Sequence, residues 1–151
     1  MLFFTKAKSE SSLFNEKTFY RQFLKDLEIA QKEVIIECPY LTASRMEMLY
    51  PVFQRLLSKK IKIKIITRDP SDHDDAYMRD QTANEILRSK ELGVSITLLR
   101  GYHHRKLAII DKKILWEGSL NILSQNNSKE IMRRYESSEE VVKMLNFLDL
   151  L

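Results

Sequence analysis

Residues 103–121 read HHRKLAIIDKKILWEGSLN, and this stretch decides how the rest of the chain is interpreted. It holds two short apolar runs, RKLAIID and KILWEG, whose composition favours strands. The runs meet at Asp111-Lys112, where a turn is expected. The pattern therefore predicts a β-hairpin.

Polar side chains are spaced along this hairpin in a regular way. His104 and Lys106 are two residues apart, so they project from the same face of an extended strand. Ser119 and Asn121 are also two residues apart and follow the second run. If the two runs pair, an imidazole, an ammonium, a hydroxyl and an amide converge on one small tetrahedral anion.

The chain around the hairpin alternates helical and strand patterns. Phe19, Phe23, Leu24 and Leu27 lie on one helix face. Helices are expected at residues 15–31 (N-cap Asn15), 44–60, 76–93 and 137–151, and strands at 33–39, 61–68, 94–100 and 130–136. Proline cannot donate a helical hydrogen bond, so Pro51 predicts a break or kink in the second helix. This order predicts an α/β fold with a mixed, largely parallel sheet flanked by helices on both faces.

Ligands of such folds bind at the carboxyl ends of the strands. The segment Cys38-Pro39-Tyr40 follows the strand at 33–39, and Arg68-Asp69 follows the strand at 61–68. Tyr40 and Arg68 are therefore candidate walls of a substrate pocket, although a plain turn role also explains Pro39 and Asp69.

Composition sets the class of protein. The 151 residues, 44% of them hydrophobic, predict one domain over 1–151, either as a whole protein or as a piece of a longer one. No stretch has the apolar length of a membrane span, so no membrane partner is expected. Cys38 is the single cysteine, which fits a reducing compartment and predicts a cytoplasmic protein.

Positive charge is concentrated near the hairpin. Residues 100–134 hold eight Lys or Arg against three acids, a larger excess than the +4 of the whole chain. This favours a polyanionic partner, DNA or RNA, although a solvated basic face also explains it.

The complete spacing resembles one known signature. It reads His104-x-Lys106, four residues, Asp111, six residues, Gly118-Ser119-x-Asn121. This is similar to the HKD motif of the phospholipase D superfamily. The upstream segments VIIECPYLTASR and IKIKIITRDP are also similar to that family, and most of all to phospholipase D-like nuclease domains found alone or attached to helicases. A helicase fusion or partner is thus possible, and the fold expected is the phospholipase D/nuclease-like fold.

The resemblance implies a phosphodiesterase that needs no metal and no cofactor and acts through a covalent phosphohistidine. By position, His104 attacks phosphorus, while Lys106 and Asn121 hold the non-bridging oxygens. Ser119 adds a hydrogen bond near the phosphate, and Glu130 holds the far nitrogen of His104. Gly118 is read as structural. So is Asp111, whose place at the hairpin turn suggests that it bonds turn amides.

The reaction that the resemblance implies needs a second imidazole to protonate the leaving group. Of His73, His103 and His104, only His104 lies in a full motif. We therefore expect a two-fold homodimer with one composite site. His103 lies off the pocket face by alternation and is expected to be a loop residue. The SDHDD segment around His73 suggests either a metal site or a solvated acidic loop, and we expect the loop.

Three further residues have two readings each. Trp116 could stack on a base, but its place within a strand favours the core. Arg133 and Arg134 could contact a nucleic-acid backbone, but only one of them can face the site if 130–136 is a strand.

The function expected is a hydrolase, an endonuclease that binds and cuts DNA or RNA. A phosphodiesterase acting on phospholipid or a small diester is the enzymatic alternative. A non-catalytic nucleic-acid-binding module is the alternative of another class, although binding alone has no need of the nucleophile His104.

Overall fold

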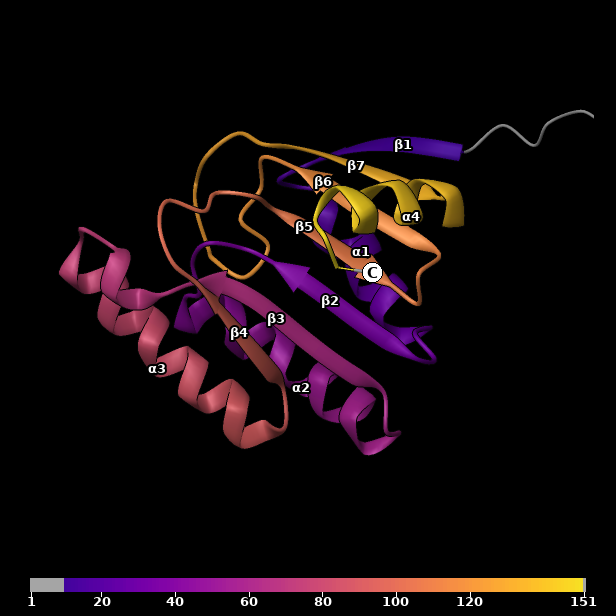
Figure 1. The fold of residues 1–151 in the computed structure, drawn as a ribbon. Helices are drawn as coiled ribbons and strands as arrows, with labels where there is room; N and C mark the ends of the chain where they lie inside the picture. Colours follow the sequence, from indigo (N-terminus) through magenta and orange to yellow (C-terminus); the bar gives the residue numbers. More distant parts are fainter. Residues whose placement is uncertain (1–9, 151) are drawn as a thin grey trace, which may run out of the picture.

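The computed structural model describes residues 10–150 and consists of one seven-stranded sheet with helices on both faces (Figure 1). The sheet order is β1-β7-β6-β5-β2-β3-β4. The strands are β1 (Glu10–Asn15), β2 (Glu33–Glu37), β3 (Lys62–Arg68), β4 (Ser95–Leu99), β5 (Leu107–Ile110), β6 (Ile114–Gly118) and β7 (Ile131–Glu136). The helices are α1 (Phe19–Glu28), α2 (Ala43–Ser58), the 3₁₀ turn η1 (Pro70–Asp72), α3 (Ala76–Leu92) and α4 (Ser138–Phe147).

The sheet is mixed, as expected, but parallel pairing does not dominate it. β2, β3 and β4 are parallel neighbours. The pairs β2–β5, β5–β6, β6–β7 and β1–β7 are antiparallel. The reason is that helical crossovers end with β4, and tight or looped connections join the strands after it.

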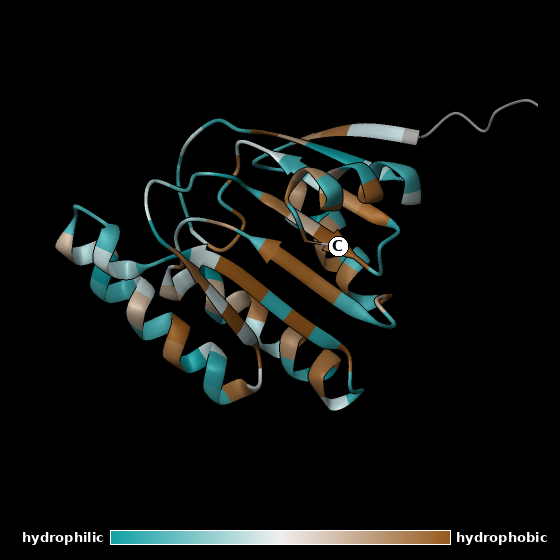
Figure 2. Cartoon of the chain, viewed as in Figure 1, coloured by the Kyte–Doolittle hydropathy of each residue, from teal (hydrophilic) through white to brown (hydrophobic). Residues whose placement is uncertain are grey.

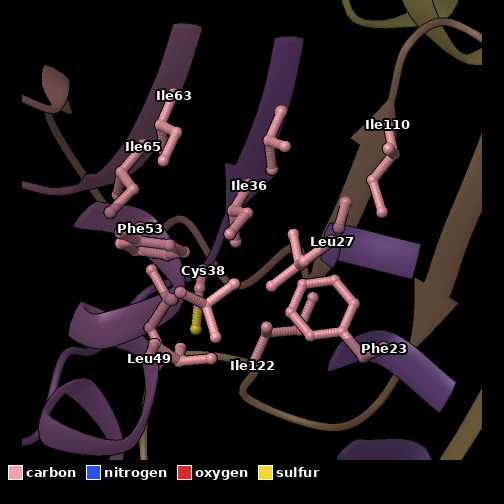
Figure 3. Packing of buried hydrophobic residues seen from close by; sticks show 14 of the residues in the cluster. Phe23, Leu27, Ile36, Cys38, Leu49, Phe53, Ile63, Ile65, Ile110 and Ile122 are labelled. Carbon is pink, nitrogen blue, oxygen red and sulfur yellow. The ribbon is translucent and has the colours of Figure 1, made fainter. Parts of the chain in front are cut away.

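Two apolar layers hold the helices against the sheet. The larger one joins α1, α2 and α3 to one face, and Phe23, Leu27 and Phe53 meet Ile36 and Ile65 there (Figure 3). The smaller one joins α4 to the other face. Figure 2 shows the corresponding pattern, with hydrophobic residues along the central strands and hydrophilic residues on the outer turns of the helices.

The N-terminal prediction is wrong in its boundary. Residues Glu10–Asn15 form an edge strand rather than leading into a helix, and α1 begins at Phe19. The Asn15 side chain accepts hydrogen bonds from the amides of Lys17 and Thr18, so it stabilises the turn between β1 and α1 instead of capping the helix. The predicted buried face of Phe19, Phe23 and Leu27 is confirmed.

The helix at Pro51 also differs from expectation, since α2 continues through Pro51 without a break. Pro51 lies on the exposed side of α2, where water can satisfy the carbonyl that loses its helical partner. The end of α3 is as predicted, with Gly93 in the left-handed conformation at φ 115°. None of the helices within residues 10–150 has the length and apolarity to cross a membrane.

Candidate active site

The predicted hairpin is present and carries the motif. Asp111 and Lys112 have φ angles of 54° and 53°, so two left-handed residues make the turn within the three-residue connection between β5 and β6. His104 and Lys106 lie in the segment that leads into β5. Arg105 points to the opposite face, where it forms an ion pair of 2.9 Å with Glu37. The direction of Arg105 fits the alternation expected from the sequence, although β5 itself begins only at Leu107.

His104 is exposed, but its surroundings change its chemistry. Partial burial, the ammonium of Lys106 and the guanidinium of Arg68, in that order, lower the pKa of His104 below its usual 6.5. Each of these factors disfavours the imidazolium. At neutral pH the ring is therefore mostly uncharged, which is the form that acts as a nucleophile.

Gly118 ends β6 and Ser119 follows it, and both lie against Ile131 at the start of β7. A Cβ on Gly118 would lie 2.1 Å from the carbonyl oxygen of Ile131, so only glycine fits there. The Ser119 amide donates to that carbonyl at 2.9 Å, and the Ser119 hydroxyl accepts from the Ile131 amide at 3.0 Å. The Ser119 hydroxyl also donates to the Ile131 carbonyl, at the long distance of 3.4 Å.

Asn121 is placed by its two apolar neighbours. Ile122 and Leu123 are fully buried, and their carbonyls accept from the Tyr20 hydroxyl at 2.6 Å and the Thr42 amide at 3.0 Å. These contacts bind the loop after β6 to α1 and to the start of α2. The Oδ1 of Asn121 is buried and has no partner in the described part of the chain.

A cavity of about 340 Å³ lies beside these groups. Its walls include Tyr40, Arg68, His73 and Asn121. The Tyr40 ring stacks on His73 at 4.7 Å between centroids and meets His104 edge-on at 6.1 Å. The structure thus brings both predicted pocket walls, Tyr40 and Arg68, to the hairpin motif.

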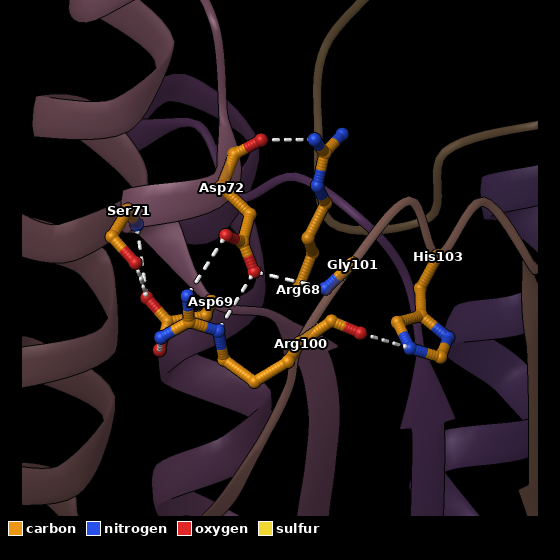
Figure 4. Close-up of polar contacts among 7 residues, drawn as sticks. All are labelled: Arg68, Asp69, Ser71, Asp72, Arg100, Gly101 and His103. Carbon is orange, nitrogen blue, oxygen red and sulfur yellow. Dashed lines mark hydrogen bonds and ion pairs between the residues drawn. The ribbon is translucent and has the colours of Figure 1, made fainter.

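The turn after β3 is tied to the segment that precedes His104 (Figure 4). Asp72 accepts from the Gly101 amide at 2.9 Å and from Nε of Arg100 at 3.0 Å, and its own carbonyl accepts from Arg68. The His103 ring contacts the Arg100 carbonyl at 2.7 Å, which makes it a loop residue as expected. These contacts hold the loop of His73 against the loop of His104.

His73 is the residue that sequence reasoning missed. The expectation of a solvated loop is wrong for its side chain, which is only 4% exposed. Its position after the strand Lys62–Arg68 is a signal that could have indicated it, because that edge also carries Arg68. Among residues 10–150, no group of three or more His, Cys, Asp or Glu is arranged to hold a metal ion.

Glu130 does not hold His104 in this structure. Its carboxylate accepts from the Ser128 hydroxyl at 2.6 Å, and its amide donates to Glu16. Within the described residues, no carboxylate is hydrogen-bonded to the His104 ring. The reason is local, since the hydroxyl of Ser128, two residues away, takes up the carboxylate.

Trp116 and Arg134 are structural rather than substrate-binding residues. Trp116 is fully buried, and its Nε1 donates to Asp26 at 2.8 Å. Arg134 forms an ion pair with the same carboxylate at 2.7 Å and retains only 11% exposure of its side chain. Asp26 is a buried acid from α1 that needs both donors, which is why neither residue is available to a ligand.

Arg133 faces the other side of the sheet. It donates to the Ser11 hydroxyl and lines a groove of about 480 Å³ beside α4. It does not reach the cavity that holds Tyr40 and Asn121.

Asp111 has the structural role expected of it, with different partners. Its carboxylate accepts from the amides of Gln31, Lys32 and Glu33 at 2.8, 2.8 and 3.0 Å. Burial would raise the pKa of Asp111, but these amides outweigh it and the pKa is lowered. The motif aspartate therefore fastens the hairpin turn to the start of β2, not to the turn's own amides.

The basic excess of residues 100–134 is partly neutralised in three dimensions. Four of its eight cations pair with acids from elsewhere in the chain. These pairs are Arg100 with Asp72, Arg105 with Glu37, Lys112 with Glu33 and Arg134 with Asp26. The excess is therefore not a continuous free basic surface.

Comparison with solved structures shows the same fold in several proteins. NucT from Helicobacter pylori matches with a TM-score of 0.67 and 22% identity, over 91% of this chain and 92% of that one. Nuc from Salmonella typhimurium, a phospholipase D family member, matches with a TM-score of 0.68 and 14% identity, over 91% of each chain. The archaeal chromatin protein TrmBL2 matches with a TM-score of 0.62 and 13% identity, over 95% of this chain and 52% of that one.

A search of curated protein sequences found no match. A family model does match, and it covers residues 23–148, which include both strands of the hairpin, the loop of Asn121 and the turn of His73. Its description is "Cardiolipin synthase, PLD-like domain". The chain therefore belongs to this phospholipase D-like family of phosphodiesterases.

Proposed function

We propose that the protein is a metal-independent endonuclease that cuts DNA or RNA through a phosphohistidine on His104. The observation that carries the proposal is the exposed imidazole of His104, whose pKa is lowered by partial burial and by the neighbouring ammonium of Lys106. The amide of Asn121 and the hydroxyl of Ser119 follow from the adjacent strand, as in the motif of phospholipase D-like nuclease domains.

The reaction runs in two displacements at phosphorus. In the first, a ring nitrogen of His104 forms a bond to phosphorus, and the bond to the leaving oxygen breaks as a second imidazolium protonates that oxygen. In the second, the now neutral second imidazole takes a proton from water. The water oxygen bonds to phosphorus, and the phosphorus–nitrogen bond breaks to restore His104.

Negative charge that develops on the non-bridging oxygens needs fixed donors. Lys106 supplies a full positive charge, and Asn121 and Ser119 supply neutral hydrogen bonds. The pKa of His104 is lowered first by partial burial and then by the charge of Lys106, which fits a repulsion between the imidazolium and the ammonium in the free site. An anionic phosphate between the two groups would relieve that repulsion, so binding is favoured.

The second imidazole comes from His104 of a second copy of the chain in our proposal. Support comes from the groove beside α4, which exposes Leu13, Ile131 and Phe147 by 61%, 65% and 78%. The same groove is also lined by Lys106 and Gly118. A copy seated over these apolar side chains would bury them and bring its own motif close to this one.

Two other functions remain as alternatives. The description of the matched family names cardiolipin synthase, which favours a phospholipid diester. The fold likeness to TrmBL2, whose published structure concerns DNA binding, favours a binding module without catalysis.

One set of assays separates the three functions. Plasmid DNA, single-stranded RNA and phosphatidylglycerol vesicles are each incubated with the protein in excess EDTA, and His104→Ala and His104→Asn are the controls. The nuclease predicts cleavage of a nucleic acid that survives EDTA and is lost in both variants. Turnover of the vesicles alone supports the lipid enzyme, and binding of DNA without cleavage supports the module. Cleavage that EDTA abolishes contradicts the proposed mechanism.

A further inference from the structure

Unpartnered polar atoms gather around the cavity beside His104. Eight buried side-chain nitrogen and oxygen atoms lack a hydrogen-bond partner in the described part of the chain. Five of them belong to residues that line this one cavity, namely Nε of Arg68, both ring nitrogens of His73, Oδ1 of Asn121 and Oγ of Ser124. Buried polar groups are normally paired, so this concentration indicates a site completed by a ligand.

His73 is the central member of the set. His73 lines the cavity, is 4% exposed and stacks its ring on Tyr40, and both of its buried ring nitrogens lack a partner in the described part of the chain. Burial, followed by the positive charge of Arg68, lowers the pKa of His73. The ring is therefore neutral at pH 7 and offers one donor and one acceptor.

The charged residues that line the cavity disfavour an anion there, in addition to the phosphate bound at the motif. Asp74 and Asp75 line the cavity together with Arg68, the one lysine or arginine of its lining, and the Arg68 guanidinium is already bonded to the Asp72 carbonyl. A group with both donors and acceptors but no charge suits this lining better than a phosphate does. The ring of Tyr40 and the side chain of Met78 add apolar contact area for such a group.

The cavity has a size suited to one small group. Its volume of about 340 Å³ lies at the lower end of the range of about 300–1,000 Å³ that small-ligand sites occupy. Asn121 belongs both to this cavity and to the motif that would hold the phosphate. A ligand in the cavity would therefore be joined directly to the phosphate under attack.

We propose that this cavity holds the nucleoside on one side of the scissile phosphate, and that His73 is the residue that hydrogen-bonds it. The inference rests on the proposed nuclease function and names the subsite that gives it substrate affinity. Asn121 contributes with both ends of its amide, the nitrogen toward the phosphate and Oδ1 toward the nucleoside. Ser124 completes the set with a hydroxyl that both donates and accepts.

Calorimetry with non-cleavable ligands tests the subsite. The probes are ethyl phosphate and the 3′- and 5′-monophosphates of adenosine and thymidine. We expect at least one nucleotide to bind the wild-type protein about tenfold more tightly than ethyl phosphate does, as one or two buried hydrogen bonds provide. His73→Phe keeps the ring stacked on Tyr40 but removes both nitrogens, so it should abolish this preference and leave the affinity for ethyl phosphate unchanged.

Three further variants make the result specific. His73→Gln restores hydrogen-bonding groups and should recover part of the preference. His103→Gln changes the other loop histidine, which lies outside the cavity, and should leave all affinities unchanged. Lys106→Met should weaken the binding of ethyl phosphate and of the nucleotides by the same factor. Thermal unfolding of each variant verifies that it is folded.

The outcomes distinguish this subsite from the proposed function. Equal affinities for ethyl phosphate and every nucleotide would overturn the subsite while leaving the phosphate site intact. No binding of any phosphate would overturn the nuclease proposal and the subsite with it. On an oligonucleotide substrate, His73→Phe should raise KM without changing kcat or its pH profile. A fall in kcat with loss of one limb of that profile would make His73 a proton donor and overturn its role as a binding residue.

Discussion

The ammonium of Lys106 changes the titration of its neighbour His104, and this coupling is the main electrostatic feature of the motif at the scale of single residues. Partial burial has the largest effect on the pKa of His104, and Lys106 and Arg68 follow. All three act in the same direction, toward the neutral ring. The same Lys106 also lowers the pKa of Cys38, although burial outweighs it and raises that pKa to about 11.

Removal of the ammonium should therefore raise the pKa of His104. In Lys106→Met the imidazolium loses a repulsive neighbour, so the ring should titrate closer to its usual 6.5. NMR titration of the ring protons measures this directly and does not depend on activity. Lys113→Met, which changes an exposed lysine at the hairpin turn, is the control. An unchanged pKa in Lys106→Met would place the ammonium away from the ring.

Asp111 should contribute to stability in a pH-dependent way. Asp111→Asn removes a charged acceptor of three amides and should lower the free energy of unfolding by about 1–3 kcal/mol at pH 7. The folded protein lowers the pKa of this carboxyl below its usual 3.8. The contribution is therefore complete above pH 3.8 and is lost as the pH falls through the lower folded value.

Urea unfolding of Asp111→Asn and wild type at several pH values measures this difference. It should be largest near neutral pH and shrink in acid. The exposed Asp80→Asn is the control and should show no such pH dependence. A difference that stays constant down to pH 2 would mean that the carboxylate charge is not involved.

At the scale of elements, the carboxylate of Asp26 joins α1 to the sheet. It accepts from Trp116 in β6 and from two nitrogens of Arg134 in β7. Two further hydrogen bonds join the loop after β6 to the helices. The Tyr20 hydroxyl in α1 donates to the Ile122 carbonyl, and the Thr42 amide at the start of α2 donates to the Leu123 carbonyl. The helices thus position Asn121 through the loop after β6, and α1 also contacts the hairpin itself through Trp116.

Loss of the Asp26 carboxylate should destabilise the protein strongly. Asp26→Ala removes the buried partner of Arg134 and leaves it only the exposed Glu136, and the expected cost is about 3–5 kcal/mol. The double variant Asp26→Leu, Arg134→Met should be considerably more stable than Asp26→Ala, because neither charge is left alone. The folded double variant should bind phosphate with the affinity of the wild type. Calorimetry at low temperature measures both affinities. A loss of phosphate affinity would show that Arg134 contributes to ligand binding.

At the scale of the whole molecule, catalysis in our proposal depends on two copies of the chain. Wild-type and His104→Ala subunits are mixed, and differently tagged heterodimers are isolated. Since one composite site needs both imidazoles, the heterodimer should lose nearly all activity. Full activity per wild-type subunit would show that one chain carries a complete site.

The apolar groove beside α4 predicts how the copies meet. Phe147→Asp places a charge among exposed apolar side chains and should shift the protein to monomers in analytical ultracentrifugation. Cleavage should fall with the dimer fraction, while the His104 pKa in the monomer stays low. Leu87→Asp changes another exposed apolar residue, on α3, and should leave the dimer intact.

Much of the fold could be predicted from local patterns. The spacing of Phe19, Phe23 and Leu27 gave the buried face of α1, and Gly93 marked the end of α3. The alternation from His104 to Lys106 placed both side chains on one face of the hairpin. β1 was not predicted, because an exposed edge strand has no second apolar face to leave a pattern.

The sequence by itself determined the order of helices and strands from α1 onward, the hairpin, and the spacing that carries the phospholipase D motif, because each depends on residues close together in the chain. Only the tertiary structure decided which distant groups meet. It paired Asp26 with Arg134, turned Glu130 toward Ser128 and brought His73 to the cavity beside His104. The physical reason is that periodicity encodes which face of an element is buried, whereas hydrogen bonds and charge pairs depend on how whole elements pack against one another.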